Sequence, residues 1–162
     1  MADGFVSVSR RIEAPAEQLF ALVADSANHP LFDGSGMVLM PVPGVRVAAV
    51  GDAFVMNMHH PRFGFYQMRS EIVEYEAGRR LVWEPARVLT DEQGGGTESA
   101  HYRWGYDFVP DGDGATTVTE SFDCTRSGPE LREATEEGEG WRDAMTASLD
   151  KLELLAKATG AS

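Results

Sequence analysis

The sequence predicts an α+β fold in which a curved antiparallel sheet of about seven strands wraps around a long C-terminal helix. Three observations support this fold. Residues 5–12 show the alternation that is typical of a half-buried strand. Residues 35–125 contain only strand patterns, separated by turn signals. An apolar stripe at helical spacing runs through 141–156. The length fits one domain, which we expect to cover residues 1–162.

The first strand carries an unexpected charge. Val6, Val8, Arg10 and Ile12 share one face, so Arg10 interrupts an apolar surface. Pro15 then suits the first turn of a helix, and Pro30 with the glycines after it limits a second helix to a turn or two. Two short helices are therefore expected after strand one.

Two later strands alternate clearly. HYRWGYDFV places Tyr102, Trp104, Tyr106 and Phe108 on one face. The next strand, TTVTESFDCT, has a dry face that contains Glu120. A second charged residue is thus predicted on the inner side of the sheet.

The chain closes with an amphipathic helix of about 18 residues, roughly 27 Å long, that ends near Gly160. Its apolar stripe is formed by Trp141, Met145, Leu149, Leu152, Leu155 and Ala156. One helix can cover only part of a concave sheet, so a hollow is expected between them.

The charge and cysteine content of the chain limit the kinds of molecule that it can bind. A formal net charge of -12, from 14 basic and 26 acidic residues, opposes binding to nucleic acid or to anionic membranes. Cys124 is the only cysteine, which excludes an intrachain disulfide, and no apolar run approaches transmembrane length. We expect a cytoplasmic protein without membrane insertion, either a monomer or a homodimer.

Three segments resemble the START-related SRPBCC superfamily, in particular its polyketide cyclase/dehydrase-like group: SVSRRIEAPAEQLFALVADSANHP, EIVEYEAGRRLVWEP and WRDAMTASLDKLELL. The resemblance covers nearly the whole chain and implies the helix-grip fold. It also implies a cavity that binds a hydrophobic or amphipathic small molecule, in which some members catalyse cyclisation, aromatisation or hydrolysis. The family commonly has tryptophan before the proline that ends the first of these segments, whereas this chain has His29 before Pro30.

The candidate ligand-binding residues are large side chains predicted to face the hollow. Their density of tyrosine, tryptophan and methionine suits an aromatic ligand with a few polar oxygens, although ordered water would also satisfy the hydroxyl groups. The set comprises His29, Phe32, Met56, Met58, Tyr66, Met68, Trp83, Tyr102, Trp104, Tyr106, Phe122, Trp141 and Met145.

The candidate catalytic residues are Arg10, Glu120 and His60. Because the implied fold makes the first and last strands neighbours, Arg10 and Glu120 are predicted to pair inside. The two residues form a fixed buried ion pair, or Arg10 extends its charged end to solvent, or they line a cavity floor that binds or protonates a ligand oxygen. Pairing predicts that Glu120→Gln lowers stability by a few kcal/mol.

The segment MNMHHPRFGF contains two adjacent histidines. Period-two geometry turns His59 outward and His60 inward, so no metal site is expected. His60 is either a cavity-mouth acid or base, or an exposed loop residue. Neither a nucleophile elbow nor a phosphate or dinucleotide motif occurs, and no cofactor is expected.

These residues and the resemblance lead to two main hypotheses for the function. The first is binding or carriage of a hydrophobic or aromatic small molecule. The second is a cofactor-independent polyketide cyclase or aromatase-like enzyme, in which Arg10, His60, Tyr66 and Glu120 move protons. A protein-binding module is a third, weaker class, because it would need an exposed apolar patch.

Overall fold

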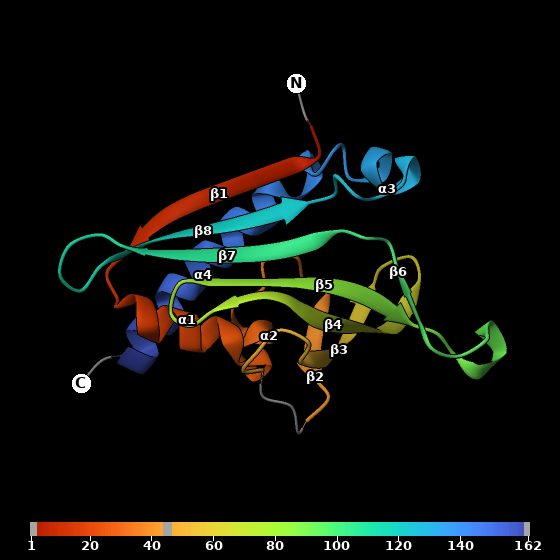
Figure 1. Ribbon diagram of the computed structural model, residues 1–162, viewed down its shortest axis with the longest axis horizontal. Helices are drawn as coiled ribbons and strands as arrows, with labels where there is room; N and C mark the ends of the chain where they lie inside the picture. The colour runs from red at the N-terminus through yellow and green to blue at the C-terminus, as the bar shows by residue number, and fades with distance from the viewer. Residues whose placement is uncertain (1–2, 44–46, 161–162) are drawn as a thin grey trace.

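The computed structural model describes residues 3–43 and 47–160, and within them the chain forms one eight-stranded antiparallel sheet (Figure 1). The strand order is β1-β8-β7-β5-β4-β3-β2, and β6 pairs with β5. The bounds are β1 (Phe5–Ile12), β2 (Val38–Pro41), β3 (Ala53–His60), β4 (Gly64–Glu76), β5 (Arg80–Val88), β6 (Thr97–Ser99), β7 (Arg103–Pro110) and β8 (Thr116–Asp123).

Four α-helices accompany the sheet in the described part of the chain. They are α1 (Ala16–Ala24), α2 (His29–Phe32), α3 (Pro129–Ala134) and α4 (Arg142–Gly160), with short 3-10 helices at Ser26–Asn28, Asp91–Gln93 and Glu139–Trp141. In Figure 1, α4 runs behind the strands along one face of the sheet. The predicted α+β architecture, with a curved antiparallel sheet around a long terminal helix, is confirmed. No helix in the described ranges is long and apolar enough to cross a membrane.

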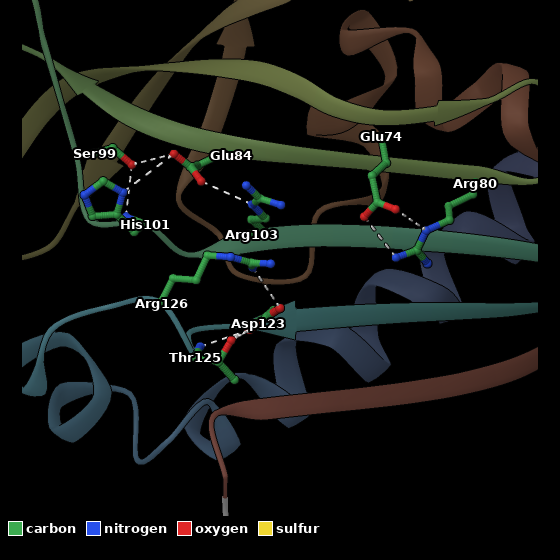
Figure 2. Close-up of polar contacts among 9 residues, drawn as sticks. All are labelled: Glu74, Arg80, Glu84, Ser99, His101, Arg103, Asp123, Thr125 and Arg126. Atoms are coloured by element: carbon green, nitrogen blue, oxygen red, sulfur yellow. Dashed lines mark hydrogen bonds and ion pairs between the residues drawn. The ribbon is translucent and has the colours of Figure 1, made fainter. Parts of the chain in front are cut away.

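The sheet face opposite α4 carries charged side chains that pair with one another (Figure 2). Arg80 contacts Glu74 at 3.2 Å, and Arg103 contacts Glu84 at 3.2 Å. Arg126 contacts Asp123 at 3.4 Å. These partly exposed pairs keep the outer face polar, and each contributes little to stability.

The inner face packs against the helices in two clusters. The larger joins buried side chains of α1, the central strands and the C-terminal half of α4, including Leu19, Phe108, Leu149 and Leu152. The smaller surrounds Met145 at the N-terminal end of α4. The leucines of α1 and α4 thus pack into the larger cluster together with aromatic residues, whereas the smaller cluster centres on Met145 and Phe122.

A glycine brings α2 and α4 together. Gly34 follows α2, and its backbone N–H donates to Ser148 Oγ at 2.8 Å. A Cβ at this position would clash with the carbonyl oxygen of Ala144 and would lie 2.7 Å from the backbone nitrogen of Ser148. Any other residue would therefore push the α2 end away from α4.

We predict that Gly34→Ala lowers the free energy of unfolding by about 1–3 kcal/mol, because the added methyl group overpacks the α2–α4 contact. Gly128→Ala is the matched control, since a Cβ there meets nothing within 4 Å. Urea denaturation of both variants measures the difference. Equal stability of the two variants would show that this contact does not require glycine.

Candidate functional site

A cavity of about 240 Å³ lies between the inner face of the sheet and the N-terminal part of α4. Every ligand-binding residue proposed from the sequence lines it. These residues are His29, Phe32, Met56, Met58, Tyr66, Met68, Trp83, Tyr102, Trp104, Tyr106, Phe122, Trp141 and Met145. The cavity wall therefore consists mainly of aromatic and methionine side chains.

Side-chain alternation along the paired strands β3 and β4 determines much of this wall. Met56 lies opposite Met68, and Met58 lies opposite Tyr66, in the register of β3 and β4. Five of the seven methionines in the chain and all three tryptophans line the cavity. Because methionine is flexible and polarizable, this wall can adapt to ligands of different shape.

Further wall residues were not proposed from the sequence. They are Asp33, Ser35, Met37, Val38, Phe54, Ser70, Pro85, Leu131, Thr135, Ala144 and Ser148. Phe54 and Ser70 were the two with a visible signal, because alternation places Phe54 on the face of Met56 and Met58, and Ser70 on the face of Tyr66 and Met68. Most of the others are small, polar or outside the regular strands, so alternation gave no reason to choose them.

His29 is part of an aromatic stack rather than an exposed mouth residue. Its ring stacks on Trp83 with centroids 5.4 Å apart, and Trp83 stacks on Tyr106 at 5.8 Å. His29 Nε2 donates to the carbonyl oxygen of Val23 at 2.7 Å. Burial lowers the pKa of His29, so the ring is neutral and Nδ1 is left as an acceptor.

Glu120 is buried beside Tyr106, which lies directly opposite it on β7. Only 5% of Glu120 is exposed, and its Oε1 has no hydrogen-bond partner among the described residues. Burial raises the pKa of Glu120 to about 8; a hydrogen bond with Tyr106 opposes this rise, and repulsion from Asp33 adds to it. The carboxyl group is therefore mostly protonated at neutral pH.

The predicted pairing of Arg10 with Glu120 is wrong. The two residues share a sheet face, but Arg10 reaches α4 instead, with Nη1 2.6 Å from Asp150 and Nη2 2.8 Å from Glu153. The Arg10 side chain is 40% exposed. An arginine that stays partly hydrated avoids most of the desolvation cost of a buried pair, and α4 offers it two carboxylates.

His60 and Arg10 are not among the described residues that line the cavity, and neither is Glu120, which lies beside Tyr106 on the neighbouring strand. His60 Nδ1 accepts a hydrogen bond from the Arg62 backbone N–H at 3.0 Å, and its ring stacks on Phe63. The cavity-mouth position predicted for His60 is therefore wrong. The described residues contain no group of three His, Cys, Asp or Glu side chains that could hold a metal ion.

The fold and the cavity define an α+β domain with an internal, largely apolar chamber. Residues 5–157 match the family described as polyketide cyclase / dehydrase and lipid transport, and the chain belongs to this family. Among curated proteins, it is 30% identical over 126 residues to the uncharacterized protein Rv0088 of Mycobacterium tuberculosis, which covers 77% of the chain. The chain spans about half the length of the curated relatives it matches, 50% in the case of Rv0088.

Solved structures share the fold at low sequence identity. Protein NE0264 from Nitrosomonas europaea superposes with a TM-score of 0.72 at 15% identity, covering 100% of this chain and 99% of that one. Protein Ms6760 from Mycobacterium smegmatis gives 0.71 at 15% identity, with 97% and 93% covered. DynU16, from the dynemicin biosynthetic locus, gives 0.58 at 18% identity, and the match covers 98% of this chain but 48% of DynU16.

We predict that Glu120→Gln stabilises the protein at alkaline pH, the reverse of the effect that a buried ion pair would give. The folded-state pKa of about 8 lies above the unfolded value of 4.5. The wild type therefore loses stability as pH rises from about 4.5 to about 8, by up to about 5 kcal/mol at 1.36 kcal/mol per pH unit. Glutamine cannot ionise, so the variant escapes this loss.

The measurement is the free energy of unfolding of wild type and Glu120→Gln at pH 5 and at pH 8.5. Glu98→Gln, at an exposed position on β6, is the control and should follow the wild type. A variant that is destabilised equally at both pH values would refute the protonated, unpaired state of Glu120.

Proposed function

We propose that the protein binds a hydrophobic, aromatic small molecule in the cavity, as a carrier or ligand-binding protein. The observation that carries this proposal is the composition of the wall, in which aromatic rings and methionines surround a few polar groups. Apolar ligand surface gains about 25 cal/mol per Å² on transfer from water, so such a wall favours apolar ligands. Membership of a family that includes lipid transport supports the same conclusion.

Two tyrosines supply polar contacts for the proposed ligand. Tyr66 and Tyr102 line the cavity, both are half-buried, and burial raises the pKa of both phenol groups. A tyrosine places a polar hydroxyl group at the end of an apolar ring. Ligand oxygens can therefore accept hydrogen bonds from these hydroxyls.

The alternative, a cofactor-independent polyketide cyclase or aromatase-like enzyme, has less support. Such an enzyme needs an acid or base within hydrogen-bond reach of the substrate. Arg10 binds carboxylates of α4, and His60 lies at the β3–β4 turn. Glu120 remains, but it does not line the described cavity wall and lies beside Tyr106, which does. Binding is therefore the function that the geometry supports best.

We predict that Ala144→Phe weakens the binding of 2-naphthol at least about tenfold, because the added ring occupies cavity space next to α4. Thr146→Phe is the matched control on the same helix, since Thr146 is exposed. Isothermal titration of the wild type and both variants gives the affinities.

Circular dichroism checks that both variants fold. Equal weakening by Ala144→Phe and Thr146→Phe, or no effect of Ala144→Phe, would place the binding of 2-naphthol outside this cavity.

A further inference from the structure

The charged groups around the cavity are of one sign. Asp33 contributes the only formally charged side chain to the described cavity wall, which contains neither lysine nor arginine. Its two carboxylate oxygens each accept a hydrogen bond from the Ser35 hydroxyl at 2.9 Å, and Oδ2 also accepts from the Gly36 N–H at 3.0 Å. The turn after α2 thus fixes a carboxylate at the cavity.

A second carboxyl group, that of Glu120, lies next to the wall residue Tyr106 and forms no ion pair with a described residue. Burial raises the pKa of both Glu120 and Tyr106, and repulsion by Asp33 adds to both shifts, so the three groups lie within electrostatic reach of one another. Arg10, the one cation on the neighbouring strand face, is held by Asp150 and Glu153 of α4. Lys151, an exposed residue of α4, donates through Nζ to the backbone carbonyl oxygen of Asp33 at 3.0 Å, but no lysine or arginine lines the described cavity wall.

The free polar groups at this end of the cavity include strong acceptors. His29 presents Nδ1 as an acceptor because Nε2 donates to the Val23 carbonyl. Several hydroxyls that could donate to a ligand are already engaged: Ser148 donates to the Ala144 carbonyl at 3.0 Å, and Thr135 donates to the Leu131 carbonyl at 2.9 Å. Although the Tyr66 and Tyr102 hydroxyls also line the cavity, a ligand group that donates a hydrogen bond fits the surroundings of His29 and Asp33 better than one that only accepts.

We propose that the cavity selects uncharged aromatic ligands that carry a hydroxyl donor, of the phenol type, and excludes organic carboxylates. The hydroxyl group lies at the end formed by His29, Asp33 and Tyr106. Desolvating a carboxylate without a cation is costly, and repulsion from Asp33 adds to the cost. A hydroxyl group, in contrast, gains a hydrogen bond to an acceptor that would otherwise be unpaired. This inference rests on the proposed binding function.

The test uses three naphthalene compounds that differ in one substituent: 2-naphthol, 2-methoxynaphthalene and 2-naphthoate. Isothermal titration at pH 7 measures the affinity of the wild type for each. We expect 2-naphthol to bind most tightly, 2-methoxynaphthalene several-fold more weakly, and 2-naphthoate at least about tenfold more weakly than 2-naphthol. Naphthoate binding as tight as that of 2-naphthol would overturn the selectivity while leaving the binding function intact.

Two variants test the origin of the discrimination. Asp33→Asn removes the charge at the wall, and Glu120→Gln removes the ionisable group beside Tyr106. We expect Asp33→Asn to reduce the ratio of the 2-naphthoate and 2-naphthol dissociation constants several-fold, and Glu120→Gln to reduce it less at pH 7 than at pH 9. Asp143→Asn, an exposed carboxylate in the first turn of α4, is the control and should leave the ratio unchanged.

The outcomes separate the two proposals. An unchanged ratio in Asp33→Asn would overturn the assignment of selectivity to this carboxylate. If none of the three compounds binds the wild type, the proposed binding of aromatic molecules fails, and the selectivity fails with it. Should Asp33→Asn not fold, the comparison of the three compounds on the wild type still decides the selectivity.

Discussion

A single helix cannot cover the concave face of an eight-stranded sheet, and the cavity follows from this constraint. The C-terminal half of α4 packs Leu149, Leu152 and Ala156 into the main core. Its N-terminal half places Ala144, Met145 and Ser148 at the cavity wall. The close contact at Gly34 fixes the distance between α2 and α4, so the hollow has a defined width rather than collapsing.

The same geometry explains the unusual state of Glu120. A carboxyl group on the inner face of β8 would ordinarily need a cation, yet the nearest arginine is held by α4 at the partly hydrated edge of the sheet. The protein therefore folds with Glu120 in its neutral form, and burial of this group lowers the free energy of unfolding more as pH rises. Buried polar groups that reduce stability are frequent at functional sites. Here the group adjoins Tyr106, a residue of the cavity wall.

The sequence predicted the sheet and the cavity wall well, because alternation decides which face of a strand each residue occupies. Tyr102, Trp104 and Tyr106 share a face in any register, and the fold leaves that face against the hollow. Alternation does not decide which partner a long side chain reaches. Arg10 was placed on the correct face but paired with the wrong carboxylate, since the position of Asp150 and Glu153 depends on how α4 docks. His60 was misplaced because the strand end bends into the Pro61 turn, where its ring packs on Phe63.

The described methionines offer the most direct test of the claim that the ligand occupies this cavity. Met37, Met56, Met58, Met68 and Met145 line it, whereas Met40 is largely exposed on the edge strand β2. NMR spectra of protein with ¹³C-labelled methionine methyl groups, recorded during titration with 2-naphthol, report on each site separately. We expect the five cavity methyl resonances to shift together with one dissociation constant while that of Met40 stays unchanged. Shifts confined to Met40, or saturation without a change at the cavity methyl groups, would contradict the account.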